Sequence, residues 1–369
     1  MSEPLVMALC GDVMTGRGID QILPHPCSST LYESCVTSAR DYVALAEAVN
    51  GVIPSPADFN YIWGDAPAAL ARLKPAVWIV NLETSITRAE RAEDKGINYR
   101  MSPENARCLA AVGISCCALA NNHVLDWGRD GLLDTLETLD ALPIRHAGAG
   151  RSSAEAAAPA ILAGHGRSRI LVFAFGVADS GIPAAWAATP ARPGVNLLRQ
   201  LTPAAVADIG KAVGAVKKPG DVAVLSLHWG GNWGYEVSDE ERRFAHALID
   251  GAGIDVIHGH SSHHPRGIEV YRGKLILYGC GDFINDYEGI SGYEAYRGDL
   301  ALLYGLSLEP PTGRLLSLSM TPFRIRKFRL HRASAEDAAW LARTLSNASA
   351  PFGTRVTVGS DGALDLAWP

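Results

Sequence analysis

Short apolar runs, rich in valine and isoleucine, recur along this chain, and each one ends in glycine or polar residues. They cover residues 5–10, 77–82, 114–120, 170–175, 222–227, 254–258 and 275–278. Runs this short and this continuously apolar are typical of strands that are covered on both faces. The chain therefore needs a fold in which other elements cover both sides of a sheet.

Segments rich in alanine, leucine, arginine and glutamate separate several of these runs. They lie at residues 67–73, 103–112, 131–139, 203–213 and 239–251. Strand and helix therefore alternate, which predicts an α/β architecture. Residues 21–61 form a long connection with prolines around one short helix, and we expect an insertion beside the first strand.

Beyond residue 283 the pattern changes to a loop rich in glycine and tyrosine. We predict two further strands at residues 300–308 and 315–328, a capped helix at residues 334–346 and a hairpin turn at residues 361–362. We interpret residues 1–330 as one domain, and residues 331–369 as a helix and hairpin packed on it.

The composition argues against nucleic-acid and membrane partners. The 369 residues carry a net charge of -6 without a block of lysine or arginine, so nothing favours binding to nucleic acid or anionic lipid. No stretch approaches the ~18 apolar residues of a membrane span, and the N-terminal run lacks the features of a secretory signal. We expect a soluble, cytoplasmic protein that binds a metal, a peptide or a small molecule. The sequence does not indicate an oligomeric state.

Side chains that bind metals follow five of the seven apolar runs. The loops at the carboxyl ends of strands in an α/β sheet face a common crevice, so these side chains should converge there. The candidate ligands are Asp12, Glu83, Asn122, His228, His260 and His263. Such a nitrogen and oxygen set suits one or two divalent ions such as Mn, Zn, Fe, Ca or Mg. The alternative is that these polar side chains are purely structural and bind no metal. Unpaired buried charges are costly, which disfavours this alternative.

An ordered set of motifs resembles a known family. GDVMTGR, NLET, ANNHVLDWG, HWGGNWGYE, GHSSHH and YGCGDF are similar to motifs of the bacterial CapA capsule-biosynthesis family, a branch of the calcineurin-like metallophosphatase superfamily. The resemblance runs from about Leu5 to Asp286. It implies a four-layer α/β/β/α sandwich, with two mixed sheets face to face between helices, and a metal centre at the strand ends.

The resemblance also implies a role for each matching residue. Glu83 stands where phosphatases place the metal-bridging aspartate. His123 matches the acid/base histidine, and Asp126 matches the carboxylate that orients it. The other ligand positions of the family are matched by Asp12, Asn122, His228, His260 and His263.

Two departures weaken the match to phosphatases. The first motif usually reads Asp-x-His, but its third position here is Met14, so one metal site lacks a histidine ligand. Water or another group must complete that site, or it binds metal more weakly. The second departure is Glu83, which lengthens the bridging position by one methylene.

Several other residues are candidates for substrate binding. Arg17 suits a substrate carboxylate or phosphate, although it equally suits an ion pair with Asp65 or Glu33. The pair Tyr99-Arg100 resembles a family segment near the site, and a structural pair is the alternative. Trp229 and Trp233 share one glycine-rich loop, where they either line a pocket or pack on the sheet.

Three functions follow from this site. The first is Cα epimerisation of a residue in a ribosomal precursor peptide, because family members outside capsule operons include soluble enzymes of lasso-peptide and related pathways. His123 with Asp126 would then be one acid/base unit. The second is metal-dependent hydrolysis of a phosphoester, with His123 protonating the leaving group. The third is an accessory role in poly-γ-glutamate capsule synthesis.

Overall fold

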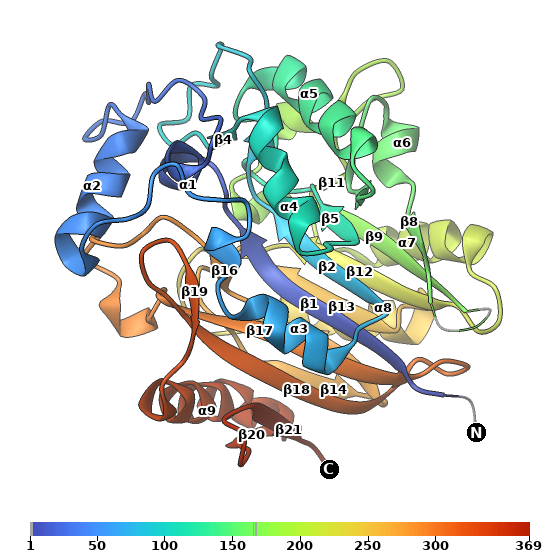
Figure 1. The fold of residues 1–369 in the computed structure, drawn as a ribbon. Coiled ribbons are helices and arrows are strands. Elements are labelled where there is room, and N and C mark those ends of the chain that lie inside the picture. Colours follow the sequence, from blue (N-terminus) through green and yellow to red (C-terminus); the bar gives the residue numbers. More distant parts are fainter. Residues whose placement is uncertain (1–2, 165, 167) are drawn as a thin grey trace.

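The computed structural model describes residues 3–164, 166 and 168–369. Within these residues, ten strands form one large mixed sheet (Figure 1). Its path runs through β20 (Arg355–Val358), β21 (Leu364–Ala367), β18 (Arg314–Ile325), β17 (Leu300–Glu309), β1 (Leu5–Val13), β2 (Val77–Leu82), β5 (Cys116–Ala118) and β6 (Arg145–Ala147). Two short strands pair beside this path, β16 (Asp282–Ile284) with β1 and β19 (Leu330–Arg332) with β18.

A second sheet has seven strands within the described residues. Its path runs through β11 (Leu197–Leu198), β9 (Arg169–Val177), β12 (Val222–His228), β13 (Val256–His260), β15 (Lys274–Leu277) and β14 (Ile268–Tyr271), with β8 (Ala160–Ala163) paired to β9. The pairs from β11 to β15 are parallel, while β14 and β8 are antiparallel to their neighbours. Both sheets are therefore mixed, and the predicted α/β class is confirmed.

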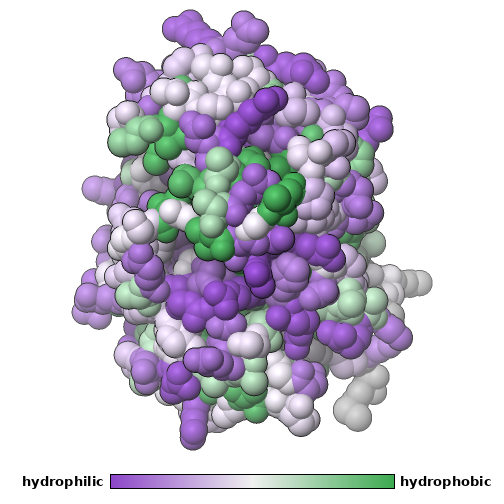
Figure 2. Space-filling view, turned by 60° about the vertical axis from the view of Figure 1, so that its left-hand side comes forward, coloured by the Kyte–Doolittle hydropathy of each residue, from purple (hydrophilic) through white to green (hydrophobic). Residues whose placement is uncertain are grey.

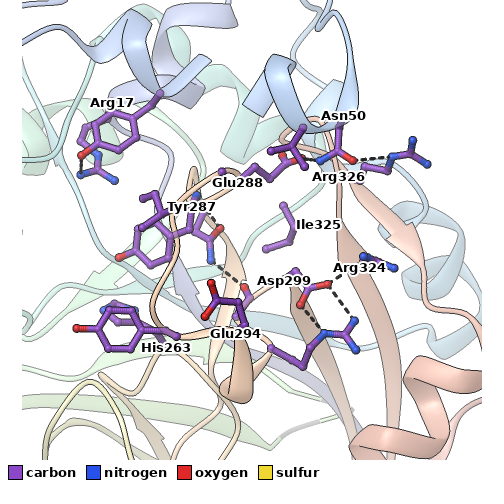
Figure 3. A pocket seen from close by; sticks show the side chains of 18 of the residues that line it. Arg17, Asn50, His263, Tyr287, Glu288, Glu294, Asp299, Arg324, Ile325 and Arg326 are labelled. Carbon is purple, nitrogen blue, oxygen red and sulfur yellow. Dashed lines mark hydrogen bonds and ion pairs between the residues drawn. The ribbon is translucent and has the colours of Figure 1, made fainter. Parts of the chain in front are cut away.

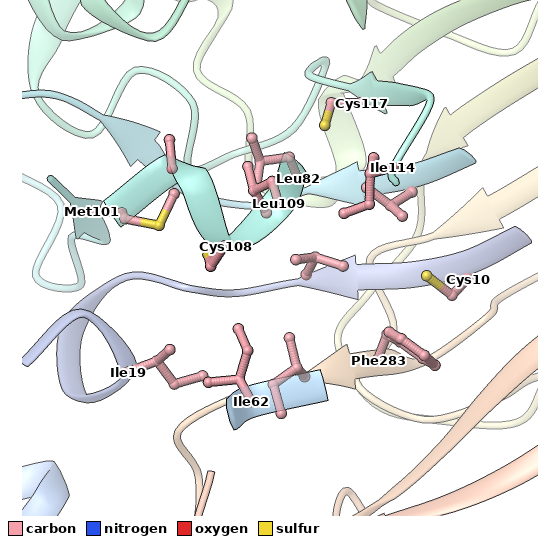
Figure 4. Packing of buried hydrophobic residues seen from close by; sticks show 14 of the residues in the cluster. Cys10, Ile19, Ile62, Leu82, Met101, Cys108, Leu109, Ile114, Cys117 and Phe283 are labelled. Carbon is pink, nitrogen blue, oxygen red and sulfur yellow. The ribbon is translucent and has the colours of Figure 1, made fainter. Parts of the chain in front are cut away.

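Successive side chains of a strand point to opposite faces of its sheet, so those of the central strands pack alternately into two different hydrophobic cores. On β1, Met7 and Leu9 join a core that also contains Val172 and Val224 of the second sheet. The alternate residues Ala8 and Cys10 join a core shared with helices on the other face of β1, where Figure 4 shows Cys10. Both faces of β1 are thus buried, which explains why its sequence is continuously apolar.

Helices cover the outer faces of both sheets. The core on the outer face of the first sheet includes residues of α1 (Arg17–Ile22), α2 (Ala39–Asn50), α3 (Ala66–Leu73), α4 (Arg107–Ala111) and α5 (Gly128–Ala141). The outer face of the second sheet packs on α7 (Pro203–Val216) and α8 (Asp239–Gly251). The helices predicted between the strands are therefore present, and their apolar sides close the cores.

The C-terminal segment extends the first sheet. The predicted helix is α9 (Ala335–Ser349), and the predicted hairpin is β20 with β21, which pairs with β18 (Figure 1). The strand predicted over 315–328 ends earlier, at Ile325, because Lys327 and Phe328 adopt positive φ angles of 57° and 53° that end an extended strand. In the described part of the chain, no helix is long and apolar enough to cross a membrane.

Candidate metal centre

The predicted metal ligands lie at one end of the two large sheets. Asp12 belongs to β1, and His228 and His260 are the last residues of β12 and β13. Glu83 directly follows β2, and Asn122 lies in the loop after β5. Because β1, β2 and β5 are parallel, and β12 and β13 are parallel, each sheet brings its own polar side chains to one edge.

One group of donors joins the two sheets. The Nε2 atom of His228 is 3.0 Å from Oδ1 of Asn122, and its Nδ1 atom is 2.9 Å from Nδ1 of His260. The Oε1 atom of Glu83 lies 4.0 Å from Nε2 of His228. Asp12, His228 and His260 each offer a donor atom within 4.8 Å of the others. The structure therefore brings these predicted ligands together.

A second group consists of Asp12, His263 and Asp282, whose donor atoms also lie within 4.8 Å of one another. His263 lies in the loop after β13, and its Nδ1 atom is 2.9 Å from Oδ1 of Asp282. Asp282 is not among the ligands that the sequence predicts. The sequence does contain a signal, because Gly281-Asp282 repeats the Gly-Asp pair of Gly11-Asp12 at the end of an apolar run.

Neighbouring polar groups hold these donors in place. The Nδ2 atom of Asn81 donates to Oδ1 of Asp12 at 2.8 Å and to Oε2 of Glu83 at 3.0 Å. The hydroxyl of Ser226 lies 2.7 Å from Nε2 of His260, which leaves Nδ1 of that ring on the side of His228. Hydrogen-bonded partners of this kind orient the ligands in metal sites. Asn81 and Ser226 are further residues that the sequence analysis does not single out.

The centre buries three carboxyl groups close together. Asp12, Glu83 and Asp282 are each at most 1% exposed. Burial, followed by repulsion from Asp282, raises the pKa of Asp12 to about 7, and burial together with the charge of Asp12 raises the pKa of Glu83. Among the described residues, no lysine or arginine forms an ion pair with any of the three carboxylates.

These donors fit a divalent cation. Burial lowers the pKa of both His228 and His260 well below the usual range, so the two rings are neutral and have lone pairs to offer. Buried carboxylates are costly unless they are paired or coordinate a metal. Carboxylate, amide and imidazole donors together suit divalent ions of the Mn, Fe and Zn type.

A histidine with a buried carboxylate partner stands beside the donors. The Nδ1 atom of His123 is 2.6 Å from Oδ2 of Asp126, and its Nε2 atom is 3.9 Å from Oε1 of Glu83. Lys95, which the sequence analysis does not single out, donates to Oδ1 of Asp126 at 2.7 Å. Burial is the main reason that the pKa of His123 is lowered to about 4. A neutral His123 thus presents Nε2 to the centre, as an acid/base group requires.

A cavity of about 650 Å³ opens beside the second group of donors, and His263 lines it (Figure 3). Trp233 stacks on Tyr293 in its wall, with ring centroids 4.1 Å apart, and its ring lies 5.3 Å from that of His263. Figure 2 shows the face of the molecule that carries α2. On this face, hydrophobic side chains lie next to hydrophilic ones. This volume lies within the range of about 300–1,000 Å³ that is typical of small-molecule sites.

Three of the residues predicted to bind substrate line this cavity, namely Arg17, Tyr99 and Trp233. Arg17 is nevertheless paired with protein groups: it forms a fork with Asp286 at 2.6 and 3.1 Å and donates to Glu33 at 3.0 Å. The alternative of an ion pair with Glu33 is therefore observed. The alternative partner Asp65 instead accepts a hydrogen bond from the backbone of Arg332.

The structure does not bring Arg100 or Trp229 to the cavity. Arg100 donates to the backbone oxygens of Ala89 and Ser28, and its guanidinium lies 3.8 Å from the ring centroid of Trp127. Trp229 is fully buried, stacks on Tyr278 and donates to its backbone oxygen at 2.9 Å. Neither residue is among those that line the cavity, and the contacts of each are those of the structural alternative.

Comparison with known proteins places these motifs in one family. The model described as "Bacterial capsule synthesis protein PGA_cap" matches residues 6–287. This range contains both groups of donors and the pair formed by His123 and Asp126.

Individual relatives carry related descriptions. A protein of Mycobacterium tuberculosis described as "Probable polyglutamine synthesis accessory protein" is 48% identical over 367 residues, which cover 99% of this chain and 96% of the relative. "PGA biosynthesis protein CapA" of Bacillus subtilis is 26% identical over 88% of this chain and 73% of its own length. "Capsule biosynthesis protein CapA" of Bacillus anthracis is 26% identical over 77% of this chain and 61% of its own length.

Proposed function

Because this chain belongs to the bacterial capsule synthesis protein family PGA_cap, we propose that it is a metal-dependent enzyme that acts on a polyglutamate-type chain during polymer synthesis. The descriptions of the relatives as polyglutamine-synthesis, PGA-biosynthesis and capsule-biosynthesis proteins support this substrate class. One observation carries the proposal: a buried set of carboxylates, which among the described residues has no lysine or arginine partner, lies beside a neutral histidine and an open cavity.

The residues divide into holders of the ion and a proton-transfer unit. Asp12, Glu83 and Asn122, with the histidines His228, His260 and His263, would hold the divalent cation. When bound, such an ion polarises a substrate oxygen and lowers the pKa of a bound water.

The proton-transfer unit is His123 with Asp126. Asp126 accepts a hydrogen bond from Nδ1 of His123 and so fixes the tautomer that leaves Nε2 free toward the centre. Lys95 neutralises the buried charge of Asp126. His123 can therefore take up a proton from a substrate atom or return one to it, which is the role of a general acid/base.

The cavity supplies contacts that suit a chain bearing carboxylates. Arg326 lines it and donates to Oδ1 of Asn50 at 3.1 Å, and among the described residues it has no acidic partner (Figure 3). A guanidinium in this position can bind a substrate carboxylate with two parallel hydrogen bonds. The aromatic rings of Trp233 and Tyr293 offer apolar surface for the methylene groups between the carboxylates.

The descriptions of the relatives bear on the three hypotheses of the sequence analysis. They favour a role in polymer synthesis, and they contain nothing that supports epimerisation of a lasso-type peptide. Phosphoester hydrolysis remains the second candidate, because the pair formed by His123 and Asp126 resembles the acid/base pair of phosphatases. Met14 in the place of a histidine ligand weighs against it.

For the fold, we propose a four-layer sandwich within the α/β class. The two sheets share one core, and helices close the other face of each sheet. This arrangement supports the four-layer metallophosphatase-like sandwich that the resemblance implies. The pairing of β21 with β18 supports the proposal that residues 331–369 pack on a domain formed by residues 1–330.

An isotope assay tests the proposed function. The Mn²⁺-loaded chain is incubated in D₂O with a short γ-linked glutamate oligomer, and the products are analysed by mass spectrometry. We expect a metal-dependent change in the oligomer that His123→Ala abolishes; shorter products indicate cleavage, and deuterium at Cα without shortening indicates epimerisation. An unchanged oligomer, with phosphate released from an aryl phosphate in a parallel reaction, would contradict the proposal.

A further inference from the structure

Met14 leaves the second group of donors without the histidine that phosphatases place there, and another side chain lies near this group. Asp282 is the first residue of β16, which pairs in parallel with β1. In this register Asp12 and Asp282 are direct neighbours on adjacent strands. Side chains of neighbouring residues in a parallel pair point to the same face of the sheet. The two carboxylates therefore face the same space.

Glycine makes this close pairing possible. A Cβ atom at Gly11 would lie 1.9 Å from the backbone oxygen of Gly281, a distance that no side chain tolerates. Gly281 itself has a φ of 74°, which favours glycine. The backbone nitrogen of Asp12 donates to that same oxygen at 3.1 Å. The two Gly-Asp pairs thus hold the strands together at the point where the carboxylates emerge.

Hydrogen bonds orient Asp282 but do not balance the negative charge of the carboxylates that lie together there. Asn285 donates to Oδ2 of Asp282 at 2.7 Å, and His263 lies 2.9 Å from Oδ1. Asp12 and Asp282 are two buried carboxylates, and among the described residues neither has a lysine or arginine partner. A divalent cation between them would balance both.

We propose that Asp282 is the ligand that replaces the missing histidine, and that Asp12, His263 and Asp282 hold a second divalent cation of the Mn, Fe or Zn class. The first ion would be held by Asn122, His228, His260 and Glu83, and Asp12 belongs to both groups of donors. This inference rests on the metal centre of the proposed function, but not on the identity of the substrate.

The competing role for Asp282 is to orient His263 without touching metal. A histidine ligand commonly donates its second ring N–H to a carboxylate, and loss of that partner lowers metal affinity about 10–100-fold. Asp282→Asn separates the two roles. The amide oxygen still accepts a hydrogen bond from Nδ1 of His263, but the side chain no longer supplies a charged ligand.

The test is the number of Mn²⁺ ions that the chelator-treated chain binds, measured by calorimetric titration with MnCl₂. We expect two equivalents for the wild type and one for Asp282→Asn. Asp20→Asn is the matched control, because Asp20 is an equally buried aspartate that bonds to Ser102 and Asn105; it should still bind two. The double variant Met14→His/Asp282→Asn should regain the second equivalent.

Electron paramagnetic resonance gives a readout independent of activity. The wild type with two Mn²⁺ ions should show the spectrum of an exchange-coupled pair, and Asp282→Asn should show that of an isolated ion. Two equivalents bound by Asp282→Asn with affinity reduced only about 10–100-fold would assign it the orienting role and overturn the proposal. A wild type that binds a single ion would overturn it as well. Because no substrate is used, neither result depends on whether the chain acts on polyglutamate.

Discussion

Two buried clusters of charge lie next to the same cavity, and they are balanced in opposite ways. In the first, Arg17 pairs with Asp286 and Glu33, and its guanidinium lies 3.8 Å from the ring centroid of Tyr42. In the second, Asp12, Glu83 and Asp282 lie among histidines without a lysine or arginine partner in the described part of the chain. The first cluster contains its own cation, whereas we propose that a bound divalent ion balances the second.

This difference separates a structural cluster from a functional one. A buried charge is costly unless an opposite charge and hydrogen bonds compensate it. Arg17 satisfies that requirement permanently and fixes the wall of the cavity. The candidate metal centre leaves the requirement open, so a divalent cation bound there would contribute both stability and chemistry.

Asp12→Ala should have the largest effect, because Asp12 is the carboxylate common to both groups of donors. We expect loss of Mn²⁺ binding and loss of detectable activity. Calorimetry and the melting temperature check this: a chelator should lower the melting temperature of the wild type but leave that of Asp12→Ala unchanged. A variant that binds metal as tightly as the wild type would remove the distinction between the two clusters.

His123→Ala should separate chemistry from metal binding within the second cluster. We expect kcat to fall about 10²–10⁴-fold, the usual contribution of a general acid/base, while the Mn²⁺ content stays the same. Metal analysis and steady-state kinetics on the same sample measure both quantities. Loss of the metal in this variant would show that His123 is a ligand.

Arg17→Met should affect stability and not metal content. Removing one partner of a buried ion pair typically lowers the free energy of unfolding by about 3–5 kcal/mol. Urea denaturation measures this change, with Arg88→Met as the control, because the ion pair of Arg88 with Glu104 is exposed and should contribute less than about 1 kcal/mol. Equal effects of the two substitutions would contradict a stabilising role of the Arg17 cluster.

Arg326→Gln should have the smallest effect. Its guanidinium hydrogen-bonds to Asn50, and loss of one charge-assisted contact to a substrate carboxylate amounts to about 1.5 kcal/mol, or roughly a tenfold rise in KM. Kinetics with glutamate oligomers measure this rise. An unchanged KM would mean that the substrate does not reach this side of the cavity.

The sequence predicts the framework of the site better than its details. Runs such as 77–82 and 222–227 are strands because both of their faces are buried, and their polar ends meet at one edge of the structure. Asp282 is absent from the prediction because β16 has three residues and lacks the long apolar run that marks the other strands. The repeated Gly-Asp pair is the only local signal that we identify, and the role of Asp282 depends on a pairing with β1 across about 270 residues.

The substrate-binding predictions show a different limit. Arg17 and Trp229 have the chemistry of ligand-binding residues, yet each finds its partner inside the fold. Asp286, which pairs with Arg17, and Tyr278, which stacks on Trp229, are distant in sequence. Residue type alone cannot distinguish a side chain that is free to bind a ligand from one that is already paired within the fold.

Anomalous diffraction from crystals of the chain grown with Mn²⁺ tests most directly whether external cations balance the second cluster. We predict two anomalous peaks within bonding distance of its carboxylates, one beside His228 and His260 and the other beside His263 and Asp282. No peak should appear at the Arg17 cluster. An absence of anomalous density at Asp12, with Lys95 turned to pair with Glu83, would contradict the account.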